Sequence, residues 1–338
     1  MKIIFAGSPE AAKITLEFLV ENQQKSGFEI AGVLSNPPTA KGRHKTPTPT
    51  PVAEYALSKG LPVFTPEHLD SAAREQIAPL GADLLVCFAY GHIFGPKFLA
   101  LFPMGGINLH PSFLPKYRGC TPVQQAILEG DELLGISIQT LSLKMDAGDI
   151  LKQDFVNIKE QDTTESLLNY SALAGAKMIC KIIEESAAAG SLIKGKPQSK
   201  EDISYTYTIT KDMAKIDWSE SAQIICRKIR AYYPDPCCWC LEENDSTLKL
   251  AQANEITLSD AQLLLESDPV HAPLLEDNVF QGFPYGKVLA YNKNTGGIFI
   301  KTGDGILCVT KLQRQGKTMM NYKDFMNGAK NFIGTILK

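Results

Sequence analysis

The sequence has 338 residues, of which 44% are hydrophobic and 21% are charged, and its formal net charge at pH 7 is -3. This length predicts two domains, and no run approaches the ~18 uninterrupted apolar residues that a membrane-spanning helix requires. The slightly negative charge argues against indiscriminate nucleic-acid binding, for which a strongly basic domain is typical.

The start of the chain and its cysteines indicate a cellular compartment. Met1 is followed directly by "KIIFAG", which has the pattern of a buried strand rather than that of a signal or transit peptide. Without a secretion signal, the eight cysteines predict reduced thiols rather than a disulfide framework. We therefore expect a cytoplasmic bacterial protein that makes no membrane contact.

Strand-like and helix-like segments alternate through the first 190 residues. The expected strands are 2–6, 29–35, 62–64, 83–89, 106–110, 135–141 and 150–157, and the expected helices are 11–22, 52–59, 67–78, 96–101, 122–129 and 163–187. Ser8 and Pro9 fit the N-cap and the first position of the first helix. This alternation predicts an α/β fold with a mostly parallel, Rossmann-like sheet.

Ligands of such sheets bind beyond the carboxyl ends of the strands. Three short segments fall at these ends: Gly7–Ser8, Ala89–Gly91 and Asn108–His110. We expect them to share one cleft. The first turn reads "GSPEAA" rather than G-x-G-x-x-G, and its Glu10 would repel a phosphate at the helix start, so a nicotinamide-dependent dehydrogenase is disfavoured.

The segment 36–51 holds five prolines, four threonines and three basic residues, so it is neither a helix nor an inner strand. Loops of this length inside a compact domain are usually functional or mobile.

The chain changes character after residue 190. Residues 191–206 are polar and lack apolar periodicity, which predicts a linker between a domain at 1–190 and a domain at 207–338. The second domain has one expected helix, within 219–232, and several short strand-like runs that predict a small β-barrel. Its residues from 301 onward carry a net charge of +5, which suits either a bound polyanion or an ordinary solvated surface.

Asn108 and His110 lie two residues apart on the strand 106–110, so they project from the same face. An amide donor beside an imidazole can hold an oxygen that becomes negative during acyl transfer. A carboxylate to orient the imidazole is available from Asp146 or Asp149, between which the spacing does not decide. The alternative is a satisfied structural pair, but the adjoining proline-stiffened loop 111–115 fits the wall of a binding site.

The stretch "NLHPSFLPKYRGCTPVQQAILEGD", followed by "MDAGDIL", resembles the signature of the folate-dependent formyltransferase family: N-x-H, an S-L-L-P-like loop and a distal D-x-G-D. Phe113 replaces the usual first leucine of that loop. The resemblance implies transfer of a formyl group from 10-formyltetrahydrofolate to a primary amine, without a metal. It implies that the catalytic residues are Asn108, His110 and Asp146, and that the folate-binding residues are Ser112, Phe113, Leu114, Pro115, Tyr90 and Gly91.

The second domain resembles that of the family members that formylate methionyl-tRNA. The resemblance is carried by "KIDWSESAQIICRKIRAYYPDP" (215–236) and "GKTMMNYKDFMNG" (316–328), with "FAGSP" near the start of the chain. It implies an OB-like barrel, initiator methionyl-tRNA as the partner, a monomer and a role in translation initiation. The implied tRNA-binding residues are Arg43, Lys45, Lys211, Arg314 and Lys317. Thr208 departs from the family, which tends to have a second lysine there.

Two other functions compete with this interpretation: a formyltransferase acting on an amino sugar nucleotide or another small amine, and a non-catalytic RNA-binding protein. The intact set of Asn108, His110 and Asp146 argues against the second. "CCWC" (237–240) has one C-x-x-C spacing but no second ligand pair, so a strand with buried thiols is favoured over a zinc site. His92 suits either the folate cleft or a surface position.

Overall fold

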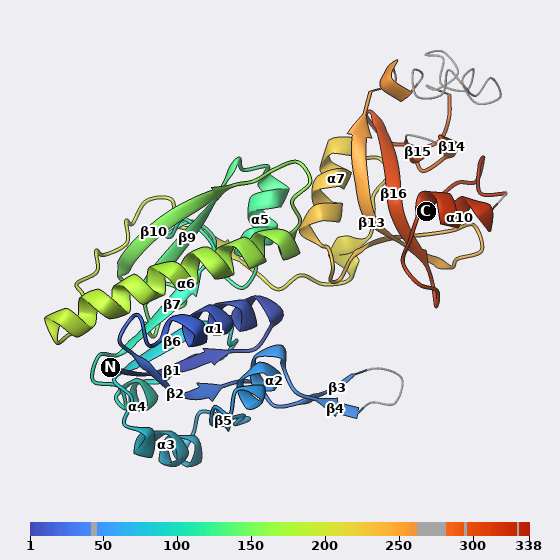
Figure 1. Cartoon of the computed structure of the whole chain (residues 1–338). Helices are drawn as coiled ribbons and strands as arrows, with labels where there is room; N and C mark the ends of the chain where they lie inside the picture. Colours follow the sequence, from blue (N-terminus) through green and yellow to red (C-terminus); the bar gives the residue numbers. More distant parts are fainter. Residues whose placement is uncertain (42–45, 258, 262–281, 294–295, 330) are drawn as a thin grey trace. The chain divides into compact units, whose positions relative to one another are not determined.

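The computed structural model describes residues 1–41, 46–257, 259–261, 282–293, 296–329 and 331–338 (Figure 1). The chain forms two compact units. Unit 1 contains residues 1–123, 132–158 and 166–207, and unit 2 contains residues 124–131, 159–165 and 208–338. The segment 191–206, for which the sequence predicts a linker, falls within unit 1.

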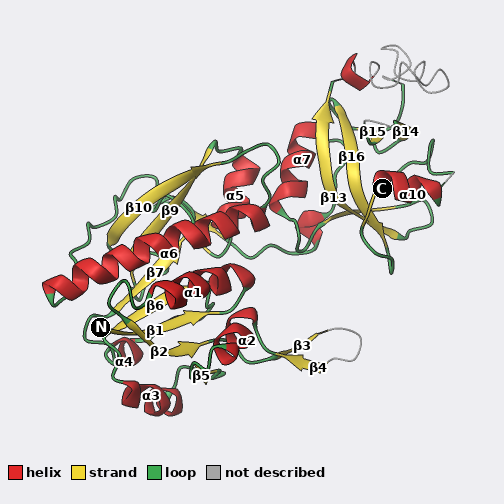
Figure 2. Ribbon diagram, in the orientation of Figure 1, coloured by secondary structure: helices red, strands yellow, loops and turns green. Residues whose placement is uncertain are grey.

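Within the described residues, unit 1 is built on a seven-stranded sheet with the order β10-β9-β7-β6-β1-β2-β5 (Figure 2). The strands are β1 (Lys2–Gly7), β2 (Glu29–Leu34), β5 (Val63–Phe64), β6 (Leu84–Phe88), β7 (Gly106–His110), β9 (Leu133–Thr140) and β10 (Ile150–Asn157). The five strands from β5 to β7 are parallel, whereas β9 is antiparallel to both of its neighbours. This confirms the predicted mostly parallel α/β sheet.

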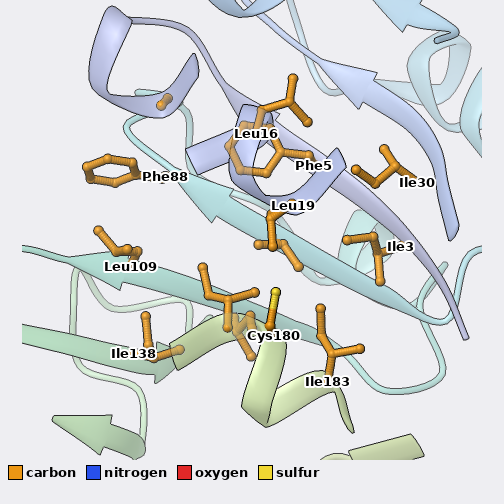
Figure 3. Packing of buried hydrophobic residues seen from close by; sticks show 14 of the residues in the cluster. Ile3, Phe5, Leu16, Leu19, Ile30, Phe88, Leu109, Ile138, Cys180 and Ile183 are labelled. Atoms are coloured by element: carbon orange, nitrogen blue, oxygen red, sulfur yellow. The ribbon is translucent and has the colours of Figure 1, made fainter. Parts of the chain in front are cut away.

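Helices cover both faces of this sheet. The helices of the unit are α1 (Glu10–Asn22), α2 (Pro51–Ser58), α3 (Ser71–Ile77), α4 (Pro96–Leu99) and most of α6 (Thr164–Ala189), and α5 (Pro122–Glu129) starts at its boundary. Ile3 and Phe5 of β1 pack with Leu16 of α1 and Ile183 of α6 on one face (Figure 3). Ile4, the residue between them, faces the other core with α3 and α4. Strands buried on both faces need continuous apolar runs, which explains "KIIFA".

The turn after β1 differs from the sequence expectation. The prediction of Ser8 as the N-cap is wrong, because α1 begins at Glu10 with Pro9 as the N-cap and without a side-chain capping bond. Ser8 Oγ instead accepts a hydrogen bond from the backbone N–H of Asn36 at 3.1 Å. Gly7 permits close packing, since a Cβ there would lie 2.7 Å from the carbonyl oxygen of Phe88.

The proline-rich segment 36–51 is not part of the main sheet. It contains a short antiparallel pair, β3 (Thr39–Lys41) and β4 (Thr46–Thr48), and ends at α2. The Thr50 side chain caps α2 by accepting a hydrogen bond from the N–H of Ala53 at 3.1 Å.

Unit 2 is an antiparallel β domain, as the sequence predicts. Its described strands are β12 (Cys238–Leu241), β13 (Thr247–Ile256), β14 (Val288–Tyr291), β15 (Ile298–Lys301), β16 (Ile306–Arg314) and β17 (Met320–Asn321). They follow the order β12-β13-β16-β15-β14, with β17 beside β16. The predicted helix is α7 (Ala222–Ala231), which buries Ile225 and Ile229, and α10 (Tyr322–Asn327) follows β17.

No helix among the described residues is both long enough and apolar enough to span a bilayer.

Candidate active site

Strand β7 carries the first two candidate residues on one face of the sheet. In its register with β9, Asn108 lies opposite Gln139 and His110 lies opposite Ser137. Leu109, between them, points into the core on the other face, which it shares with α1 and α6 (Figure 3). The period of two in a strand therefore places Asn108 and His110 side by side, away from α6.

The turn between β9 and β10 brings the carboxylate. It leaves the sheet beside the amino end of β7, where Thr140 lies opposite Ile107. Residues 141–149 then fold back toward β7. As a result, the Oδ1 atom of Asp146 lies 3.6 Å from Nδ1 of His110. Asp149 is exposed, so the structure selects Asp146 of the two aspartates left open by the sequence. A Cβ on Gly148 would collide with the backbone of Thr140, which explains the small residue in this turn.

His110 is 4% exposed, and its Nε2 atom lies 2.9 Å from the carbonyl oxygen of Tyr117. A carbonyl oxygen can only accept a hydrogen bond, so Nε2 carries the hydrogen in this contact. The other ring nitrogen, Nδ1, faces Asp146. Because Nε2 keeps its hydrogen in this contact, the neutral imidazole and the imidazolium differ by the hydrogen on Nδ1.

Both carboxylate oxygens of Asp146 are held by the protein. Oδ1 accepts a hydrogen bond from Nε2 of the buried Gln139, and Oδ2 accepts one from the backbone N–H of Gly119, each at 2.8 Å. These bonds fix the orientation of the carboxylate relative to the imidazole.

Asn108 is half-buried, and its side-chain amide makes no hydrogen bond to any residue that the structure describes. A half-buried amide without a protein partner is available to a ligand oxygen. The neighbouring Cys87, paired with Asn108 across β6 and β7, is buried, and burial raises the pKa of its thiol to about 12. Cys87 is therefore a neutral, inert side chain at neutral pH.

The predicted folate-binding loop is only partly exposed. Ser112 is buried and its Oγ donates to the carbonyl of Lys116 at 2.6 Å. Leu114 is also buried, and its backbone N–H donates to Oγ of Ser137 at 3.2 Å. Phe113 is 39% exposed and Pro115 is half-buried. Ser112 and Leu114 thus anchor the loop, and Phe113 and Pro115 present its surface.

The other two predicted folate-binding residues, Tyr90 and Gly91, differ in burial. The Tyr90 ring is buried against Phe94 at 5.5 Å between centroids, and burial raises the pKa of its phenol to about 12. Its hydroxyl has no hydrogen-bond partner within the described part of the chain. Gly91 is exposed and has a φ of 83°, while the exposed His92 lies against the Tyr90 ring. Of the two predicted residues, only Gly91 is therefore open to a ligand.

Of the predicted tRNA-binding residues, Arg43 and Lys45 lie outside the described residues. Lys211 and Lys317 are exposed. The Arg314 guanidinium is already engaged by unit 2. Its Nη2 atom lies 2.7 Å from Oε1 of Glu242, and it stacks over the Phe325 ring at 4.7 Å from the centroid.

The "CCWC" thiols line the interior of unit 2. Cys237, Cys238 and Cys240 are all buried, and burial raises the pKa of each thiol. No group of three His, Cys, Asp or Glu side chains in the described ranges is placed to hold a metal ion.

Sequence reasoning missed the residues that support the Asp146 turn, chiefly Gln139, Arg118 and Gln198. Gln139 could be inferred once β9 is paired with β7, because it then lies opposite Asn108. Gln198 carries no such signal, since it lies in the segment for which the sequence predicts a linker.

Comparison with known proteins assigns the chain to a family. Residues 1–183 match the family model described as formyl transferase, and residues 208–330 match the formyl transferase C-terminal domain. A solved structure of HypX from Aquifex aeolicus in complex with tetrahydrofolic acid has a similar fold, with a TM-score of 0.63 at 14% sequence identity. The match covers 98% of this chain and 48% of that protein, so the chain spans about half the length of HypX.

Two sequence relatives match over nearly their whole length. The chain is 37% identical to a methionyl-tRNA formyltransferase of Treponema denticola, with 98% of both sequences covered. It is 34% identical to a methionyl-tRNA formyltransferase of Pseudoalteromonas translucida, with 100% of this chain and 97% of that protein covered. Since both domain models and full-length relatives agree, the chain belongs to the methionyl-tRNA formyltransferase family, whose members are folate-dependent formyltransferases.

Proposed function

We propose that the chain transfers the formyl group of 10-formyltetrahydrofolate to the free amino group of methionyl-initiator tRNA. The product, N-formylmethionyl-tRNA, serves translation initiation in the cytoplasm, a reducing compartment that suits eight cysteines carrying thiols. The observation that carries the proposal is the Asn108 amide, with no partner among the described side chains, beside the His110–Asp146 pair.

The chemistry follows from these groups. The amine of the methionyl ester attacks the formyl carbon, and the formyl oxygen becomes negative in the tetrahedral intermediate. Asn108 and the Nδ1–H of a protonated His110 donate hydrogen bonds to this oxygen, because the Nε2–H is already bound to the Tyr117 carbonyl. One such donor in a dry site is worth about 3 kcal/mol. The Asp146 carboxylate attracts the positive charge on the imidazole and so keeps the donor in place.

The proton balance assigns Asp146 a second role. The attacking amine must lose a proton, and the departing folate nitrogen must gain one when its bond to the formyl carbon breaks. We assign the transfer of this proton to the Asp146 carboxylate, and general acid–base help of this kind typically contributes about a hundred- to ten-thousand-fold in rate.

Binding roles follow from exposure. Phe113, Pro115 and the backbone at Gly91 would contact the folate, since these are the parts of the predicted set that are not buried. In unit 2, the exposed Lys211 and Lys317 would contact tRNA phosphates.

The molecule that accepts the formyl group distinguishes the proposed reaction from formylation of an amino sugar nucleotide. The chain is incubated with 10-formyltetrahydrofolate and either methionyl-initiator tRNA or an amino sugar nucleotide, and formylated product is measured. We expect formylation of the charged tRNA and none of the sugar. Formylation of the sugar nucleotide with the charged tRNA left unmodified would contradict the proposal.

A further inference from the structure

The side chain of Gln198 reaches the turn that carries Asp146. Its Nε2 atom donates to the backbone carbonyls of Asp146 and Gly148, each at 2.8 Å. Nε2 also lies 3.2 Å from Oε1 of Gln139, the residue that holds the Asp146 carboxylate. Gln198 is half-buried, whereas its neighbours Pro197 and Ser199 are exposed. One polar side chain of the segment 191–206, that of Gln198, is thus hydrogen-bonded to the Asp146 turn.

The Asp146 turn needs such support. Asp146 has a φ of 47°, a left-handed conformation that is costly for a residue with a Cβ. Residues kept in this region persist only where the surrounding structure holds them. The two bonds from Gln198 tie down the carbonyls on either side of Ala147, and so fix the backbone from which the Asp146 carboxylate projects.

The amide of Gln198 is oriented by Arg118. The Arg118 side chain donates to Oε1 of Gln198 from Nε at 3.1 Å and from Nη2 at 2.6 Å. Because Arg118 can only donate and the turn carbonyls can only accept, the oxygen and nitrogen of Gln198 cannot exchange places. Arg118 is 7% exposed and makes no ion pair with a carboxylate in the part of the chain that the structure describes. Gln198 is therefore its main partner.

The same segment also supports His110. Ser204 Oγ accepts a hydrogen bond from the N–H of Tyr117 at 2.8 Å, and the Ser204 carbonyl accepts one from the N–H of Arg118 at 2.8 Å. Beyond it, β11 (Tyr205–Thr206) pairs with β8 (Arg118–Gly119). The Tyr117 carbonyl binds Nε2 of His110, and the Gly119 N–H binds Asp146. One segment thus contacts the supports of both catalytic side chains.

We propose that Gln198 is a positioning residue for the formyl-transfer reaction, acting through the Asp146 turn and locked by Arg118. The proposal rests on the role proposed above for Asp146. In this role Gln198 makes no contact with the substrate, so its loss moves the carboxylate without removing a binding contact.

Three substitutions separate this role from a general structural one. Gln198→Glu keeps the acceptor for Arg118 but replaces the donor with an oxygen that faces two carbonyls. Gln198→Met removes both functions without adding charge. Gln23→Met is the matched control, because Gln23 is also half-buried in unit 1 and also bonds backbone groups, Val20 O at 3.1 Å and Ile30 N at 3.3 Å.

The measurements are kcat, KM for both substrates and Tm of each variant. A displacement of about 1 Å can cost about a hundredfold in rate, so we expect kcat of both Gln198 variants to fall about 10- to 100-fold. KM should stay within about threefold, since no binding contact is lost. The Tm of Gln198→Glu should fall no more than that of Gln23→Met, whose kcat should be normal.

A kcat of Gln198→Glu within about threefold of the wild type would overturn the proposal, as would a loss of kcat accompanied by an equal loss of substrate affinity or by unfolding. Asp146→Ala, measured in parallel, distinguishes a failure of the positioning role of Gln198 from a failure of the proposed role of Asp146. If Asp146→Ala is inactive but Gln198→Glu is normal, only the positioning role fails. If Asp146→Ala is active, the proposed role of Asp146 fails.

Discussion

At the scale of single residues, the site depends on which hydrogen bonds the protein makes and which it leaves open. The protein binds one nitrogen of His110 with the Tyr117 carbonyl and both oxygens of Asp146 with Gln139 and Gly119. It leaves the Asn108 amide without a bond to any described residue. The residues that must be oriented are held, and the residue that would meet the substrate oxygen is open.

Replacement of Asn108 by alanine separates the catalytic interpretation from the structural one. Since the amide has no described partner, its loss should change Tm by only about 2 °C or less. The same change removes an oxyanion donor, so kcat should fall about 10²- to 10³-fold. Steady-state kinetics and a thermal melt check both values. A marked loss of Tm with near-normal kcat would show that Asn108 belongs to a structural pair instead.

At the scale of elements, the sequence pattern predicted the sheet better than the ends of its helices. The strand prediction 106–110 coincides with β7, because a short apolar run between glycine and proline has clear limits. The helix predicted over 67–78 is shorter, since α3 spans Ser71–Ile77. Asp70 accepts a hydrogen bond from the N–H of Ala73 at 3.1 Å and so starts the helix later.

The site was predictable only where its residues are local in sequence. Asn108 and His110 share a strand, and the strand period alone places them together. The selection of Asp146 over Asp149 depends on the turn folding back onto β7, which no local pattern encodes. The bond between Arg118 and Gln198 joins residues 80 positions apart, so the linker-like composition of 191–206 gave no sign of it.

Two basic residues near β16 should behave in opposite ways. Arg314→Ala removes the ion pair with Glu242 and the stacking on Phe325, so stability should fall by about 1–2 kcal/mol with little change in KM for tRNA. The exposed Lys317 makes no such ion pair among the described side chains. Lys317→Ala should keep its stability, raise KM for tRNA a few-fold and reduce the salt dependence of binding by one phosphate contact. Denaturant melts and salt-dependent tRNA binding check these effects, and an exchange of the two phenotypes would contradict the assignment.

At the scale of the whole molecule, burial determines which cysteines can react with a reagent in solution. All eight cysteines carry thiols, and seven of them are buried, with Cys120 as the exposed one. A thiol reagent should therefore modify one site rapidly in the native protein and eight after unfolding. Replacement of Cys120 by serine should abolish the rapid reaction. Rapid native modification of several sites would contradict this packing.

Burial of the thiols also sets the response to alkaline pH. Desolvation raises the pKa of Cys87, Cys226 and Cys308 to about 12, whereas an unfolded thiol titrates near 8.5. The folded chain binds these protons more tightly, so the stabilisation is complete below about pH 8.5 and is lost as the pH rises toward 12. Each thiol should lower the free energy of unfolding by about 1.4 kcal/mol per pH unit in this window. Denaturant melts between pH 8 and 11 check this slope, which Cys120→Ser should leave unchanged. A flat profile would contradict it.

The catalytic role of His110 is best tested by the single-turnover rate of formyl transfer to methionyl-tRNA by His110→Ala, with tetrahydrofolate affinity measured on the same preparation. We expect a rate at least about a thousandfold below the wild type, because one group supplies both the donor and the charge, while the Kd for tetrahydrofolate stays within about threefold. The exposed His68, replaced by alanine, is the control and should have a normal rate. A His110→Ala rate within tenfold of the wild type would contradict a catalytic role for His110.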